Sequence, residues 1–438
     1  MLTTKNLLNH LVNFSHDLKY KDLPPEVVHE AKRRLIDSMA CAIAGSHDPA
    51  TLLLAKNSCE SMEEKAFRFT HLIRVLDWND TYLSKEPAHP SDNIGALLAL
   101  CNYGISGEDF ITAMVLAYEI QCRFCDAASL RKNGWDHVAY VSLATAFATA
   151  KILKLNREKM THAASLALRW IPLRQVRAGS DLSMSKGLSA AEAVKFGVHS
   201  AQLANCGITG PSEMMEGQFG FINQATGELD FSAFTSLGSE FKILKTHIKL
   251  YPVEYHAQAA VDVALQIRKT LNGRVENITR LDLESYEACR AIIADKNKRR
   301  PATKESADHS LFYIMAVTLL DGEMTLKQYA PERYNDPAVL QLIDKMSDVQ
   351  ETPKFNEAYL NREKPAFPLR CKVIGYPIPY TVEVEFPKGH FANPLTDDEL
   401  VEKFKALTSQ DINPVSLKSG LEYLWHLEDE PRLAPVKF

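Results

Sequence analysis

The sequence lacks long apolar runs and any excess of positive charge. No stretch approaches the roughly 20 consecutive apolar residues that a membrane-spanning helix needs. Lys and Arg together number 50, against 55 Asp and Glu, and such a balance gives no indication of nucleic-acid binding. We therefore expect neither a membrane nor a nucleic-acid partner.

The eight cysteines do not form the regular spacing of a disulfide framework. Cys122 and Cys125 make a single Cys-x-x-Cys pair, with no second pair and no nearby histidine at ligand spacing, which predicts no zinc site. The N-terminal stretch 1–22 has neither a continuous apolar core nor an Arg-rich bias, so we expect no signal or transit peptide. Reduced thiols packed in helices, in a cytoplasmic protein, fit this pattern.

No fixed repeat period is present, and helical periodicity dominates the first two thirds of the chain. The Ala-rich run 141–153 is apolar nearly all round, which predicts a central helix. This pattern predicts a large helical bundle rather than a solenoid. One further helix is predicted to begin after Pro24, and others are predicted at 109–127, 157–168, 190–205 and 258–271.

The pattern changes after Asn272-Gly273. Apolar and polar residues alternate in 275–285, 370–376 and 380–386, which predicts strands, and helices are predicted at 310–320 and 337–347 between them. We therefore expect a mainly α protein, with a helical-bundle domain at 1–272 and 396–438 and a smaller α+β lid domain at 273–395. The cleft of such a layout is a favoured place for a small-molecule site.

The segment from Arg74 to Leu98 is the most informative part of the sequence. Between Asp77 and His89 it gathers three carboxylates, a threonine, a lysine and a histidine. So much unpaired charge predicts that the segment is not core, because burying it would be prohibitive. Polar groups on a loop held by packed flanks suit acid–base chemistry.

Other polar clusters also interrupt the helical pattern. His137 stands where a Gly-containing loop meets the Ala-rich helix, and a histidine there is commonly a structural cap. Arg174, Arg177 and Lys186 lie within thirteen residues that hold a single acid, which suits carboxylate recognition better than a solvated loop. The basic run 296–300 is either a solvated face or a positive rim. Further candidates are Lys249 and His256 before one helix and Tyr313 in another, where packing is the alternative.

Taken together, these motifs resemble the MmgE/PrpD family, from about Leu23 to Tyr329. The resemblance rests on Asp-x-x-Asp-Thr with Ala-His-Pro-Ser, Ser-Met-x-Lys-Gly, Thr-Gly-Pro-Ser, Tyr-Pro-x-Glu-Tyr-His and Ala-Asp-His-Ser-Leu-x-Tyr. It implies a cofactor-independent enzyme, commonly a homodimer, with a helical domain and a smaller lid. Since no Cys triad or His-rich cluster in the sequence suggests an iron–sulfur centre, we also expect metal-free chemistry. The implied activity is dehydration of 2-methylcitrate, a tricarboxylate, to 2-methyl-cis-aconitate, and the same reaction is expected with citrate, which would give cis-aconitate.

Residue by residue, the resemblance implies a catalytic set that includes Lys186 and Tyr313. Asp77 is the expected base and His137 or His89 the acid, although exchanging these roles fits the sequence equally well. Ser185 and Lys304 depart from the tryptophan and arginine usual in the family. The residues expected to bind substrate are Thr81, Lys85, Arg174, Arg177, Lys249 and His256.

Two other functions remain open from the sequence. The same scaffold supports cis-aconitate decarboxylation or epimerisation of a related di- or tricarboxylate. The longer loop around Lys85-Glu86-Pro87 favours dehydration. A helical ligand-binding protein without catalysis is the alternative from a different class, and binding of citrate without turnover would identify it.

Overall fold

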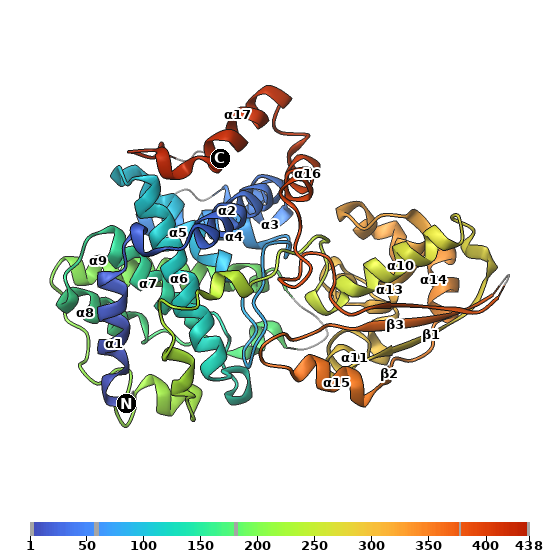
Figure 1. The fold of residues 1–438 in the computed structure, drawn as a ribbon, viewed down its shortest axis with the longest axis horizontal. Helices are drawn as coiled ribbons and strands as arrows, with labels where there is room; N and C mark the ends of the chain where they lie inside the picture. Colours follow the sequence, from blue (N-terminus) through green and yellow to red (C-terminus); the bar gives the residue numbers. More distant parts are fainter. Residues whose placement is uncertain (1–3, 57–60, 179–182, 376–377, 436–438) are drawn as a thin grey trace. The chain divides into compact units, whose positions relative to one another are not determined.

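A computed structural model describes residues 4–56, 61–178, 183–375 and 378–435. The chain divides into two compact units (Figure 1). Apart from Ser183, the described residues up to Thr246 belong to the larger unit, which resumes at Thr396, and the smaller unit comprises Ser183 and the described residues of His247–Leu395. The expected fold class, mainly α with a small sheet, is confirmed.

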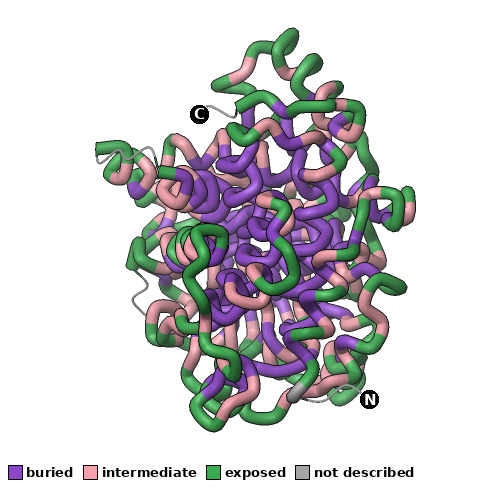
Figure 2. The backbone as a smooth tube through the Cα atoms, turned by 90° about the vertical axis from the view of Figure 1, so that its left-hand side faces the viewer, coloured by how far each residue is buried: buried purple, intermediate pink, exposed green. Residues whose placement is uncertain are grey.

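Helices build the larger unit, and buried residues gather in its interior while exposed stretches lie at the periphery (Figure 2). The predicted helices are present with small shifts of their ends, and α9 begins five residues earlier than expected, at Ser185. The helices of this unit in its first part are α1 (Thr4–Asp17), α2 (Pro25–Gly45), α3 (Pro49–Leu54), α4 (Met62–Arg74), α5 (Ile94–Leu100), α6 (Gly107–Ala127), α7 (Ala139–Ile152), α8 (Arg157–Ala167) and α9 (Ser185–Asn205).

The Ala-rich helix α7 is central, as its composition predicts. All of its residues except Lys151 are buried. Small side chains let α9 approach it closely: a Cβ on Gly197 would lie 2.6 Å from the carbonyl oxygen of Ser142. A helix that is apolar nearly all round therefore lies in the core of the bundle.

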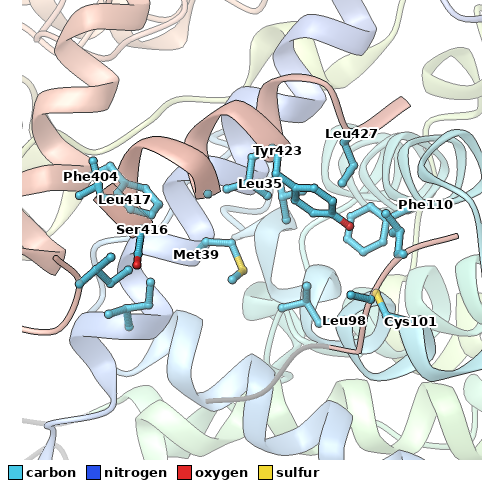
Figure 3. Close-up of a pocket in the computed structure, with 16 residues that line it drawn as sticks. Leu35, Met39, Leu98, Cys101, Phe110, Phe404, Ser416, Leu417, Tyr423 and Leu427 are labelled. Atoms are coloured by element: carbon cyan, nitrogen blue, oxygen red, sulfur yellow. The ribbon is translucent and has the colours of Figure 1, made fainter. Parts of the chain in front are cut away.

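Two C-terminal helices, α16 (Asp397–Thr408) and α17 (Pro414–Trp425), complete the larger unit. The first packs on α2 and begins with a capping box, in which the Thr396 side chain accepts from the backbone N–H of Glu399. Beneath α17 lies a cavity of about 230 Å³ with an almost wholly apolar lining (Figure 3). Its walls include Leu35 and Met39 of α2, Phe404 of α16 and Tyr423 of α17.

A four-stranded sheet with strand order β2-β1-β3-β4 organises the smaller unit. The pairs β1–β3 and β3–β4 are antiparallel, with Leu283 opposite Cys371 and Cys371 opposite Val382, whereas β1–β2 is parallel. The predicted strands correspond to β1 (Ile278–Ser285), β3 (Leu369–Gly375) and β4 (Tyr380–Val384), and the short β2 (Gln350–Glu351) was not predicted. The helices are α10 (Gln258–Thr270), α11 (Glu287–Ile293), α12 (Lys304–Ala307), α13 (Leu311–Asp321), α14 (Pro337–Asp344) and α15 (Pro353–Leu360).

The expected domain boundary at 272/273 differs from the division in the structure. The chain enters the smaller unit at His247, so α10 belongs there and packs on β3, β4 and α13. Periodicity predicts this helix correctly but carries no information about the unit against which its apolar face packs. The return to the larger unit at Thr396 matches the expected position.

The thiols and the hydropathy of the helices can also be compared with expectation. Seven cysteines are described and all are free, whereas Cys59 lies outside the described residues. Six are buried, but Cys371 lies in strand β3 rather than in a helix, and Cys206 is exposed. Within the described ranges, no helix combines the length and apolarity needed to span a bilayer.

Candidate active site

The three carboxylates of the polar segment 77–89 and most of its other residues are buried, so the prediction that the segment lies outside the core is wrong. Asp80 and Glu86 are 1% and 0% exposed. Their charges are compensated by partners far along the chain: the Tyr118 hydroxyl donates to Asp80 Oδ2 at 2.8 Å, and the Ser129 hydroxyl donates to Glu86 Oε2 at 2.8 Å. Burial is prohibitive for a charge without partners, whereas these two carboxylates are hydrogen-bonded.

Asp77 is held in an unusual backbone conformation just after α4. Its φ of 54° lies in the left-handed region, which costs a non-glycine residue on the order of 1 kcal/mol. The side chain is fixed from two directions, because Arg74 Nη1 donates to Oδ1 at 2.7 Å and Lys186 Nζ donates to Oδ2 at 3.3 Å. Lys186 comes from the first turn of α9, so this carboxylate joins two helices.

Next to α7, Asp136 organises a second group of charges. Its carboxylate accepts a hydrogen bond from Arg177 Nε at 2.7 Å and lies 2.9 Å from His137 Nδ1. Burial alone would raise the pKa of Asp136, but Arg177 and His137 hold that pKa below its ordinary value. A carboxylate beside Nδ1 assigns the ring proton of neutral His137 to that nitrogen, which leaves Nε2 as an acceptor.

His137 is a neutral histidine with an unused nitrogen. Burial, reinforced by Arg177, lowers its pKa to about 4. Its Nε2 is buried and has no hydrogen-bond partner among the described residues, and the same holds for Arg177 Nη2. Buried polar atoms are nearly always satisfied, so unsatisfied ones require an explanation. A bound ligand with acceptor and donor groups is one such explanation.

His89 faces the same region. Its ring centroid lies 6.0 Å from that of His137, and its Nδ1 lies 2.7 Å from the carbonyl oxygen of Asp80, to which it can only donate. Asp92, in the turn that follows, is fully buried, and this burial raises its pKa to about 7 despite the opposing effect of Arg74. The larger unit thus places two histidines and several compensated charges close together.

Two predicted substrate-binding side chains of this unit, those of Thr81 and Lys85, are engaged elsewhere, and a third predicted residue, Arg174, is held through its backbone. The Thr81 hydroxyl donates to the carbonyl of Ala88 at 3.1 Å and so stabilises the loop itself. Lys85 Nζ donates to Asp230 Oδ2 at 2.9 Å. Arg174 begins the short turn that carries Arg177, and its backbone N–H donates to the Gly134 carbonyl at 2.9 Å. Their assignment to a substrate stays a prediction.

The three candidates in the smaller unit are all buried. Lys249 is 1% exposed. His256 Nδ1 lies 2.5 Å from the hydroxyl of Tyr286. Tyr313 donates its hydroxyl hydrogen to the carbonyl of Gln328, and burial raises its pKa. These contacts agree with the packing alternative for Tyr313, and its catalytic role stays a prediction.

The basic run 296–300 is anchored within the smaller unit. The Arg299 guanidinium lies 3.9 Å from the centroid of the Phe312 ring and donates to Asp348 at 2.9 Å. Arg300 donates to Asp344 at 2.5 Å. Because these two arginines have partners of their own, the structure gives no support to a positive rim formed by them.

Sequence reasoning missed three members of the site: Arg74, Asp92 and Asp136. Each was visible as a neighbour of a chosen residue, since Asp136 directly precedes His137 and Arg74 lies three residues before Asp77. Their importance depends on pairing across the fold, which spacing alone does not reveal. Among the described residues, no group of three or more His, Cys, Asp or Glu side chains is arranged to hold a metal ion.

The fold and the site define a mainly helical, two-unit protein with an acid–base cluster on its helical unit. Comparison with known families adds the particular lineage. Residues 9–66 and 54–233 match the MmgE/PrpD N-terminal domain, and residues 251–419 match the MmgE/PrpD C-terminal domain. The chain belongs to the MmgE/PrpD family, as the motifs in the sequence predicted.

Three relatives illustrate what the chain is similar to. It is 30% identical to the 2-methylcitrate dehydratase of Escherichia coli (strain K12) over 78% of this chain and 74% of the relative. It is 27% identical to the mitochondrial 2-methylcitrate dehydratase of Yarrowia lipolytica, over 88% of this chain and 80% of the relative. It is also 29% identical to an alkylcitrate dehydratase of a fungal species, over 86% and 82%.

Proposed function

We propose that this protein is a hydro-lyase that removes water from 2-methylcitrate, and from citrate, to give 2-methyl-cis-aconitate and cis-aconitate. The observation that carries the proposal is the His137–Asp136 pair, with its buried, unpartnered Nε2 beside cationic side chains. Several relatives named 2-methylcitrate dehydratase, at about 30% identity over most of the chain, support the same activity.

The reaction requires two proton movements on a highly charged substrate. A C–H bond next to a carboxylate breaks, its electron pair forms the C=C bond, and the tertiary C–O bond breaks as the hydroxyl leaves with a proton as water. The site must therefore supply a base, an acid and cations that stabilise negative charge as it builds on the carboxylate.

The contacts of the larger unit favour His137 as the base and His89 as the acid. Both oxygens of Asp77 already accept from cations, which weakens that carboxylate as a base. His137 is neutral and presents an acceptor nitrogen, while Asp136 stabilises the imidazolium that proton transfer would create. This assignment moves the role of base from Asp77 to His137 and keeps His89 as the acid, and Asp77 as base is the alternative.

Cations suited to the substrate carboxylates surround these histidines. Arg177 has a buried Nη2 without a partner in the described chain, and a planar guanidinium binds carboxylates well. We assign Lys186 to the carboxylate on which charge develops, with Asp77 holding its ammonium in place. The roles that the resemblance implies for Lys249, His256 and Tyr313 stay predictions.

The first experiment incubates the purified, chelator-treated protein with 2-methylcitrate and follows the absorbance of the conjugated alkene. Appearance of the alkene at a catalytic rate supports a metal-independent dehydratase. No reaction with 2-methylcitrate or citrate contradicts the proposal. Release of carbon dioxide from cis-aconitate would then identify the decarboxylase alternative.

Cellular context and assembly complete the proposal. We expect a cytoplasmic homodimer, as the resemblance and the free thiols suggest. Light scattering coupled to size-exclusion chromatography measures the mass in solution directly, and a value near the 49.1 kDa of one chain would contradict the dimer.

A further inference from the structure

A buried lysine of the C-terminal segment contacts the residue that follows Asp77. Lys403 of α16 is 5% exposed, and its Nζ lies 2.5 Å from Asp37 Oδ1 and 3.0 Å from the carbonyl oxygen of Trp78. The same ammonium lies 5.6 Å from the centroid of the Trp78 ring. One cation thus fixes both the backbone and the side chain of Trp78.

This contact matters because the neighbouring backbone is strained. Asp77 has a φ of 54°, and a left-handed non-glycine residue persists only where its surroundings hold it. Lys154 and Asn272, the other such residues in the described ranges, each follow the end of a helix. Asp77 differs from them because its carboxylate must also meet Arg74 and Lys186.

Lys403 is itself held rigidly. Asp37 is 1% exposed and lies in the middle of α2. The N-terminus of α16 is tied to the same helix, because Asp397 pairs there with Arg33 of α2. Two ion pairs along α2 therefore set the position of α16. A lysine in this frame can act as a fixed support rather than as a mobile surface charge.

We propose that Lys403, held by Asp37, is a positioning residue: through the Trp78 carbonyl it keeps Asp77 in the geometry that orients Lys186. The C-terminal segment thereby contributes to catalysis without touching the substrate. The kinetic part of this inference rests on the proposed dehydratase function, whereas its structural part does not.

The test removes the support without leaving a buried charge unpaired. In the double variant Lys403→Met with Asp37→Asn, both charges disappear together, which limits the stability loss expected when one partner of a buried pair is removed alone. The matched control is Lys32→Met with Glu428→Gln. Lys32 makes the same kind of contacts as Lys403: its Nζ lies 2.5 Å from the Glu428 carboxylate and 2.8 Å from the Trp425 carbonyl oxygen. These contacts do not involve the Asp77 loop.

We expect the Lys403 double variant to lower kcat by about tenfold to a hundredfold, the size of effect that a misplacement of about 1 Å produces, with KM changed much less. The control double variant should keep kcat and KM within about twofold of the wild-type values. Both are assayed well below their melting temperatures, which are measured alongside. A wild-type kcat in the Lys403 variant, or equal losses in both variants, would overturn the proposal.

A crystal structure of the Lys403 double variant gives a readout that does not depend on turnover. We expect the Trp78 carbonyl to move and Asp77 to leave the left-handed region. A loop that superposes on the parent loop refutes the positioning role. If the wild-type protein turns over neither tricarboxylate, the proposed function has failed, and this structural comparison still decides the inference.

Discussion

His137 in the larger unit and His390 in the smaller unit are similar in burial and in pKa, yet they differ in their hydrogen bonds. Burial lowers the pKa of each to about 4. His390 uses both ring nitrogens, since Nε2 donates to the Pro365 carbonyl at 2.9 Å and Nδ1 accepts the backbone N–H of Ala392 at 2.9 Å. Among the described residues, His137 has a hydrogen-bond partner only at Nδ1, which lies beside Asp136.

The comparison shows that a lowered pKa does not by itself mark a functional histidine. Desolvation produces the same shift in a histidine that only holds a loop together. The distinguishing feature is the nitrogen that remains buried and unsatisfied, because native structures seldom tolerate that cost without a purpose. Four predictions test the distinction, beginning with the largest expected effect.

Replacing the two histidines should have opposite consequences. We expect His137→Asn to lower kcat by about 10²–10⁴-fold, the usual contribution of a general acid or base, with little change in melting temperature. His390→Asn should retain kcat but lose stability, about 1–3 kcal/mol for each buried group left unsatisfied. Steady-state kinetics and urea unfolding measure both quantities. Equal kinetic losses in the two variants would abolish the contrast.

Two lysines on α9 extend the comparison to cations. Lys186→Ala should lose about 10²–10³-fold in kcat while the protein remains folded, because it removes a fixed charge next to the reacting carboxylate. Lys195→Ala is the control. This lysine lies on the same helix, is half-exposed, and pairs with Glu64 of α4 at 2.8 Å. A Lys186→Ala enzyme with the wild-type rate would refute the assignment of Lys186.

Substituting one arginine in each unit should distinguish an effect on substrate binding from an effect on stability. Arg177→Lys keeps a cation beside Asp136 but removes the Nη2 donor, so we expect KM for 2-methylcitrate to rise about tenfold. Arg299→Lys should instead lower the melting temperature, because a compact ammonium cannot reproduce the stacking on Phe312. A raised KM in the Arg299 variant would restore the idea of a positive rim.

The smallest effect concerns pH. Both histidines have a folded-state pKa near 4, below their ordinary value, so the unfolded chain binds more protons between about pH 6.5 and 4. The free energy of unfolding should therefore fall as the pH drops through this window, by on the order of 1–3 kcal/mol for each histidine. His390→Asn should flatten this dependence, as measured by urea unfolding at pH 7.5 and pH 5. The acid limb of kcat/KM should report the pKa of about 4 of His137.

The elements of the fold were largely predictable, since 3.6-residue periodicity defines α6 to α10 and alternation defines β3 and β4. Packing partners were not predictable: nothing in residues 77–89 shows that Tyr118 and Ser129 compensate their charges. For the same reason, Lys403 could not be connected with Asp77, because more than 300 residues separate them in the sequence. Motifs identified the reactive side chains, but only the folded arrangement separates His137 from a buried structural histidine.

The apolar cavity beneath α17 has a consequence for the order in which parts of the protein unfold. The side chains that line the cavity lack van der Waals contacts on the cavity side, and Leu421 is the only buried residue of α17. Helix α17 is therefore prone to local opening, and its amide hydrogens should exchange earlier than those of α2 and α16. Because α16 and Lys403 are anchored separately on α2, the protein should keep its activity on warming after α17 has opened.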